Sequence, residues 1–265
     1  DDIILVYSPN HWEDIIKTLP KENLYILYNK NNSLELMHHS KFIDYNSIFK
    51  IDANTNFTQK VIWANHLMEH LNKNENLDEY GFAWGDPENE KDDLGNYLKI
   101  KNQLKSLVSK NTTILELGTL GGKWTKYMFD AKHIICVDIN NYFIDAIKER
   151  YPEQLNAINF YISKGNELHG IKTNSIDVVF CIDTLVRVEK EYIYNYFKEI
   201  SRVLKKDGKA IIHLPNSDIE DCRNRNFTDL TTGEIKTELE KYFNSYILDS
   251  NTIVHGTLVK IGLDN

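Results

Sequence analysis

The chain has 265 residues, and its 31 Lys and Arg against 39 Asp and Glu give a formal net charge of -8. This length can bury the core of one large α/β domain, with a smaller unit beside it. This acidic sequence has no cluster of basic residues of the kind that binding to duplex nucleic acid requires, which argues against such a substrate.

The cysteines and the hydropathy pattern indicate the cellular compartment in which the protein is expected. Cys136, Cys181 and Cys222 have neither CxxC spacing nor an even count, so we expect buried, reduced thiols and a cytoplasmic protein. No run approaches the roughly 20 apolar residues of a membrane span. No signal-peptide pattern opens the chain, although a chain that does not begin with Met leaves a removed targeting segment as an open alternative.

Residues 1–75 predict a small α/β unit. "DIILVYS" and "NLYILYN" have the pattern of strands, "HWEDIIKTL" lies between them as a helix, and 58–74 predicts a longer helix. The unit could be an appendage, an arm that forms a homodimer, or part of a substrate lid, and the sequence leaves these alternatives open. Residues 76–111, rich in acids, Gly and aromatics, predict a lid or a connecting segment.

Residues 112–265 predict a parallel sheet covered by helices, because strand-like and helix-like segments alternate. Strands are expected at 112–118, 133–139, 157–163, 175–183 and 209–215, and helices at 123–130, 143–150, 190–205 and 233–243. Two more strands, 245–249 and 252–262, have only "SN" between them, which predicts an antiparallel hairpin.

A glycine turn follows the first of these strands, in "ELGTLGG". Its spacing departs from the dinucleotide fingerprint G-x-G-x-x-G, because Thr119 and Leu120 separate Gly118 from Gly121. The acid at the strand end, Glu116, followed by G-x-x-G-G instead resembles the first motif of class I S-adenosylmethionine-dependent methyltransferases, E/D-x-G-x-G-x-G. Leu120 replaces the middle glycine, so we expect the backbone to bend there.

The later segments extend this resemblance as an ordered series. Asp138 ends the second strand, where the family carries an acid that binds a ribose diol. Asn166, in "SKGNEL", stands where the family reads the adenine amino group. Residues 174–216 then resemble the family's fourth and later motifs in order, and the similarity covers roughly 95–262.

The resemblance implies a fold, a cofactor and a set of binding residues. The implied fold is a Rossmann-like seven-stranded sheet with an antiparallel last strand, which agrees with the predicted hairpin. The implied cofactor is S-adenosylmethionine, with S-adenosylhomocysteine as product. The residues expected to bind it are Glu116, Gly118, Gly121, Trp124, Asp138, Ile139, Asn166, Asp183, Tyr97 and Trp84.

Three residues are candidates for catalysis, because ligands of open α/β sheets bind at the carboxyl ends of the strands. We expect His213, then Asp183, to accept a proton. Arg187 ends "DTLVR", which is similar to D-S-F-V-H in bacterial enzymes that methylate sugars and related surface-glycan metabolites. An arginine stays protonated, so Arg187 is suited to a substrate phosphate or carboxylate. Structural roles remain alternatives: a cap at Asp183, a hydrogen bond at His213, and an ion pair of Arg187 with Glu189 or Glu191.

The sequence thus predicts an O-methyltransferase for a sugar or sugar nucleotide of bacterial capsule or surface polysaccharide. Trp84, in a W-G-x-P element similar to that of sugar-type relatives, and Tyr97 are expected to close over the pocket. No metal is expected, since "HLMEH" does not have the order of H-E-x-x-H. The alternatives are another small acceptor (phosphorylated, amine or natural product) and a non-catalytic partner-binding protein with the same fold.

Overall fold

The structure is a computed structural model that divides the chain into two compact units, residues 1–74 and 75–265. It describes residues 4–6, 24–30, 33–38, 85–90, 93, 95–139, 141–225 and 227–263. In the first unit, β1 (Ile4–Val6) pairs in parallel with β2 (Leu24–Lys30), which pairs antiparallel with β3 (Ser33–His38). The helices expected at 11–19 and 58–74 lie outside the described residues.

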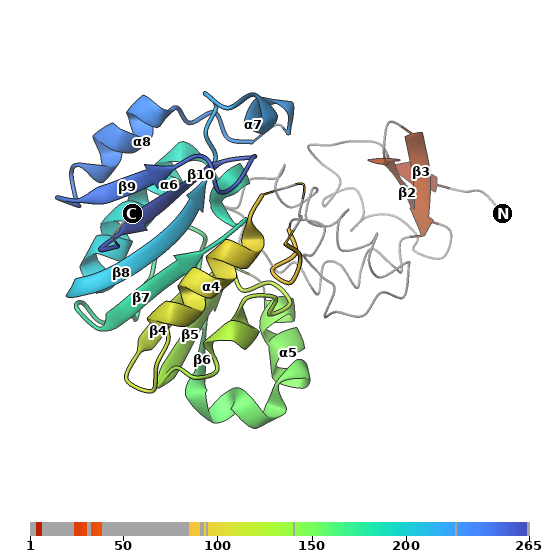
Figure 1. The fold of residues 1–265 in the computed structure, drawn as a ribbon. Coiled ribbons are helices and arrows are strands. Elements are labelled where there is room, and N and C mark those ends of the chain that lie inside the picture. The colour runs from red at the N-terminus through yellow and green to blue at the C-terminus, as the bar shows by residue number, and fades with distance from the viewer. Residues whose placement is uncertain are drawn as a thin grey trace. The chain divides into compact units, whose positions relative to one another are not determined.

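The second unit contains a seven-stranded sheet (Figure 1). Its strands are β4 (Thr113–Leu117), β5 (His133–Asp138), β6 (Ile158–Ile162), β7 (Ile176–Cys181), β8 (Leu204–Leu214), β9 (Tyr246–Asp249) and β10 (Thr257–Ile261), in the order β6-β5-β4-β7-β8-β10-β9. The strands β4 to β8 pair in parallel, and β10 runs antiparallel to both β8 and β9. The Rossmann-like fold with an antiparallel last strand is therefore confirmed.

Helices cover both faces of this sheet. They are α4 (Tyr97–Leu107), α5 (Asn141–Arg150), α6 (Lys190–Val203), α7 (Glu220–Asn224) and α8 (Thr232–Leu239), with 3-10 turns η3 (Thr125–Met128), η4 (Pro152–Ala157) and η5 (Leu185–Arg187). The apolar stripe of α6 packs against one face and that of α4 against the other (Figure 1). Among the described residues, no helix is both long and apolar enough to cross a membrane.

The structure corrects three expectations about local elements. The helix expected at 123–130 is the single turn η3, because residues 119–125 are all buried and leave no solvent face for a surface helix. The helix expected over 190–205 does end before "KDG", at Val203, but the strand expected from 209 already begins at Leu204 and includes that stretch. The hairpin is present, but residues 250–256 separate its strands, because β10 begins only at Thr257.

Gly118 provides a test of how tightly the turn after β4 is built. Its φ is +79°, and an added Cβ would lie 2.1 Å from the hydroxyl oxygen of Thr184. A Gly118→Ala variant should lose roughly 2–5 kcal/mol of unfolding free energy, through left-handed strain and overpacking.

The matched control is Gly233→Ala in α8, where the nearest atom to an added Cβ is 4.0 Å away. This change should stabilise the protein by roughly 0.5–1 kcal/mol, since alanine favours a helix over glycine. Urea denaturation measures both variants. Equal effects of the two changes would contradict the close approach of Thr184 to Gly118.

Candidate functional site

The glycine turn bends sharply at the carboxyl end of β4. Gly118 and Gly122 have positive φ angles, and Leu120 also adopts the left-handed region, with φ 46°. The expected backbone bend at Leu120 is therefore confirmed. The amide of Leu120 donates to Oδ2 of Asp138 at 3.2 Å, so the acid that ends β5 holds the strained turn in place.

Buried polar atoms gather at this turn. Glu116 Oε2 accepts a hydrogen bond from Thr125 at 2.6 Å. Its other oxygen, the Thr119 hydroxyl and the Trp124 indole N–H are buried and find no hydrogen-bond partner among the described residues. Burial raises the pKa of the Glu116 carboxyl to about 8, with the nearby charge of Asp138 adding to the effect and the Thr125 hydrogen bond opposing it. Unpartnered polar atoms are costly to bury, so this turn fits a polar ligand.

The other residues expected to bind the cofactor follow β5 and β6, the next strands along the sheet. Asp138 is buried at the end of β5, and Ile139 follows it half-buried. Asn166 lies half-buried in the turn after β6, where its backbone carbonyl accepts a hydrogen bond from the side chain of Asn195 on α6. These residues share one edge of the sheet with the glycine turn. Gly121 is buried within that turn.

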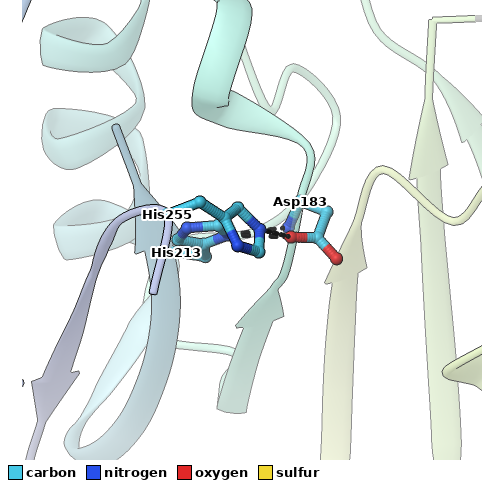
Figure 2. A group of neighbouring side chains, drawn as sticks. All are labelled: Asp183, His213 and His255. Atoms are coloured by element: carbon cyan, nitrogen blue, oxygen red, sulfur yellow. Dashed lines mark hydrogen bonds and ion pairs between the residues drawn. The ribbon is translucent and has the colours of Figure 1, made fainter. Parts of the chain in front are cut away.

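A second cluster lies at the same edge, around Asp183. This residue follows β7 with φ 59°, in the left-handed region. Its Oδ1 lies 3.0 Å from Nδ1 of His213 on β8 and 3.3 Å from Nε2 of His255. Figure 2 shows both imidazole rings beside this carboxylate. The Tyr97 hydroxyl donates to the carboxylate at 3.0 and 3.1 Å, and Nζ of Lys123 lies 3.6 Å from Oδ2.

This environment keeps Asp183 ionised. Burial alone would raise the pKa of its carboxyl, but hydrogen bonds to His213 and His255 and the charge of Lys123 outweigh it and hold the pKa well below its usual range. Burial lowers the pKa of the His213 imidazole, and its hydrogen bond to Asp183 offsets part of that effect. The cluster thus pairs a buried carboxylate with a neutral imidazole.

Lys123 and Tyr97 are enclosed by aromatic rings and backbone. The Lys123 ammonium lies over the Tyr97 and Trp124 rings, 5.4 and 5.6 Å from their centroids, and donates to the carbonyl of Gly85. Tyr97 also stacks on His255, with centroids 6.3 Å apart. Trp84, the other aromatic residue expected to close the pocket, lies outside the described residues.

Arg187 lies apart from the carboxylate cluster but is linked to it. Its guanidinium lies 4.8 Å from the centroid of Phe227 and donates to the backbone carbonyl of Arg225. The ring of Phe227 in turn meets His255 edge-on at 5.9 Å. Burial, with the nearby charge of Arg225, lowers the pKa of Arg187.

Two members of the cluster, His255 and Lys123, were not expected from the sequence. The sequence-based strand over 252–262 placed His255 inside a strand, and the helix over 123–130 assigned Lys123 to a surface element. In the sequence, the glycine at position 256 was the one indication of this close packing. Its Cβ would fall 2.1 Å from Nε2 of His213, so a glycine is needed where this loop passes β8.

Comparison with known proteins identifies the core of this unit. Residues 115–212 match the family model described as "Methyltransferase domain". This segment is a methyltransferase domain. It includes the glycine turn, Asp138 and Asp183, and it ends one residue before His213. No curated protein matches the chain.

Solved structures share the fold of the methyltransferase domain. The PH0226 protein from Pyrococcus horikoshii OT3 is 16% identical, with a TM-score of 0.53 over 69% of this chain and 96% of its own. A protein from Nostoc punctiforme PCC 73102, proposed to be an O-methyltransferase, is 17% identical, with a TM-score of 0.50 over 62% of this chain and 54% of its own. Similarity at this level concerns the fold.

S-adenosylmethionine is the cofactor of this domain. The unpartnered atoms of Glu116, Thr119 and Trp124 fit a ligand with charged and polar groups. The glycine turn would hold its methionine part and Asp138 its ribose. When bound, the cofactor supplies an activated methyl group and a neutral leaving group.

The charge balance around Asp183 can be tested through Lys123. A Lys123→Met variant leaves a buried carboxylate without its ammonium and should lose roughly 3–5 kcal/mol of unfolding free energy. The exposed Lys132→Met control should change it by less than about 0.5 kcal/mol. In the double variant with Asp183→Asn, the loss should be smaller than the sum of the two single losses. Additive losses would show that Lys123 does not compensate Asp183.

Proposed function

We propose that the protein is an O-methyltransferase that acts on a hydroxyl of a sugar or sugar nucleotide in bacterial capsule or surface polysaccharide synthesis. The carboxylate–imidazole cluster beside the glycine turn carries this proposal. A hydroxyl acceptor must lose a proton as it is methylated, and Asp183, His213 and His255 form a group that can accept one. Thr184 connects the two parts, because its hydroxyl lies 3.1 Å from the Leu117 carbonyl and packs over Gly118.

The chain's own residues supply orientation and proton acceptance. Methyl transfer is an in-line displacement, so the main requirement is to hold the acceptor oxygen near the methyl group, which can contribute about 7–11 kcal/mol in favourable cases. Asp183 fixes the imidazoles through hydrogen bonds. The enclosed surroundings of Tyr97 and Lys123 limit water at this point, which strengthens these electrostatic interactions.

Arg187 is proposed to hold an anionic group of the acceptor. Its guanidinium stacks on Phe227, and the ring of Phe227 also contacts His255. Only the Phe227 ring therefore links Arg187 to the proton-accepting cluster in this chain of contacts. A planar guanidinium is well matched to a phosphate or carboxylate. This placement favours a sugar nucleotide or a sugar phosphate over a neutral sugar.

The sugar assignment depends on the resemblance of "DTLVR" and the W-G-x-P element to bacterial sugar-methylating enzymes. Another phosphorylated, amine or natural-product acceptor is the nearest alternative, and a non-catalytic partner-binding protein is the more distant one. Cys136, Cys181 and Cys222 are all buried and unpaired, which agrees with the proposed cytoplasmic location. Residues 1–75 are proposed to form the arm of a homodimer, with an appendage or part of a substrate lid as alternatives.

Cofactor binding separates the enzyme from the non-catalytic alternative. Titration with S-adenosylhomocysteine should release heat and raise the melting temperature. Asp138→Ala should weaken this affinity roughly 10- to 100-fold, because hydrogen bonds to a charged group are lost. The control Asp145→Ala changes an exposed acid on α5 and should leave affinity unchanged. Absence of heat and of any thermal shift with the wild-type protein would contradict the assignment.

Acceptor identity is tested directly with a panel of nucleotide-linked hexoses and heptoses. Incubation with S-adenosylmethionine should add one methyl group to at least one sugar, detected by mass spectrometry. Arg187→Gln should raise KM for a phosphorylated acceptor more than it lowers kcat, because uniform binding is lost. If no sugar in the panel is methylated while the cofactor binds, the sugar proposal fails and a different small acceptor is indicated.

A further inference from the structure

The loop that carries His255 is fixed in place by hydrogen bonds. Residues 250–256 connect β9 to β10, and Asp249 accepts hydrogen bonds from the amides of Asn251 and Thr252 and from the Thr252 hydroxyl. The Thr252 carbonyl accepts from the amide of Asn96, the residue that caps α4, at 2.7 Å. The loop that carries His255 is therefore fixed to the helix that carries Tyr97.

The neighbours of His255 determine which ring nitrogen carries the proton. Its Nε2 lies 3.3 Å from Asp183 Oδ1 and 3.2 Å from the Tyr97 hydroxyl, which itself donates to the carboxylate. An ionised carboxylate only accepts hydrogen bonds, so a hydrogen bond from His255 to Asp183 requires the proton on Nε2. The lone pair is then on Nδ1, which is buried and has no hydrogen-bond partner among the described residues.

His213 differs from His255 in the surroundings of its second nitrogen. Its Nδ1 faces Asp183, which leaves Nε2 as the other nitrogen. This Nε2 is also buried without a hydrogen-bond partner among the described residues, and Gly256 passes so close to it that an added Cβ would fall 2.1 Å away. The side chain of His213 is fully buried. With Gly256 packed against its second nitrogen, His213 is placed to orient Asp183.

We propose that His255 is the catalytic base, with Asp183, Tyr97 and His213 as positioning residues. As the acceptor oxygen forms its bond to the methyl carbon, its proton passes to Nδ1 of His255. The carbon–sulfur bond breaks, and its electron pair stays on the sulfur, which becomes a neutral thioether. Asp183 stabilises the resulting imidazolium. This assignment rests on the proposed hydroxyl acceptor.

The charged and titratable groups around His255 agree with this role. Asp183 and Tyr97 face Nε2, and the ring of His213 meets that of His255 edge-on at 5.0 Å. Lys123 acts through Asp183, and Arg187 contacts the Phe227 ring, which in turn meets the ring of His255. Arg187 would thus hold an anionic acceptor on the side of His255 that meets Phe227.

The tautomer can be measured without any acceptor. Protein labelled with 15N-histidine and saturated with S-adenosylhomocysteine should show, in long-range 1H–15N spectra above neutral pH, His255 with a protonated Nε2 and an unprotonated Nδ1. The signals of His255 are assigned by their loss in His255→Gln, or by contacts with the Phe227 ring if that variant does not fold. Protonation at Nδ1 would overturn the proposal.

The kinetics of methyl transfer to an acceptor provide a second test of the role of His255. His255→Gln should lower kcat by about two to four powers of ten, while the affinity of the folded variant for S-adenosylhomocysteine stays within twofold of that of the wild type. Its residual rate should rise with pH, since hydroxide then replaces the base. The control His169→Gln changes an exposed turn residue and should leave kcat unchanged. A loss of less than fivefold in folded His255→Gln would overturn the role.

A metal-binding assay tests the alternative that the same side chains bind a metal ion. The ligand-type atoms of Asp183, His213 and His255 lie within 4.8 Å of one another and could hold a metal ion. Elemental analysis of the purified protein should find less than about one tenth of an equivalent of transition metal, because Lys123 already neutralises the carboxylate. If the wild-type protein holds one equivalent of metal and His255→Gln holds none, the assignment of His255 as the base would be overturned. Normal tautomer and cofactor binding without sugar methylation would contradict only the proposed acceptor.

Discussion

The buried charge of Asp183 is the constraint on which the arrangement of the site depends. Removing a carboxylate from water costs several kcal/mol unless other groups compensate it. The compensation comes from four separate segments, which carry Tyr97, Lys123, His213 and His255. These segments are the first turn of α4, the end of the glycine turn, β8 and the loop before β10. One carboxylate therefore joins elements that lie far apart in the chain.

This constraint explains two local departures from regular structure. The segment after the glycine turn has to bring Lys123 back toward Asp183, and a helix that continued from Gly122 would carry its residues along the surface. The connection between β9 and β10 has to reach across the end of β8, so a two-residue turn is too short. In both places, long-range compensation of a charge overrides the local pattern.

The sequence predicted those features that depend on short-range patterns. Alternating apolar segments predicted the parallel strands, and the ordered series from Glu116 to 216 indicated the cofactor. The same reasoning placed His255 inside a strand and Lys123 on a surface helix, because neither residue shows its partner in its own neighbourhood. His213 was found, but only the three-dimensional packing of Gly256 shows that its second nitrogen is enclosed. Periodicity carries no information about such contacts.

The glycine turn and the Asp183 cluster lie at the same edge of the sheet, and Thr184 packs between them. A cofactor held by the turn would therefore present its sulfur near the cluster. The most direct test is a crystal structure with S-adenosylhomocysteine bound. We predict that the ribose contacts Asp138 and that the sulfur faces His255. A sulfur that points away from the Asp183 cluster, or a cofactor bound elsewhere, would contradict this account.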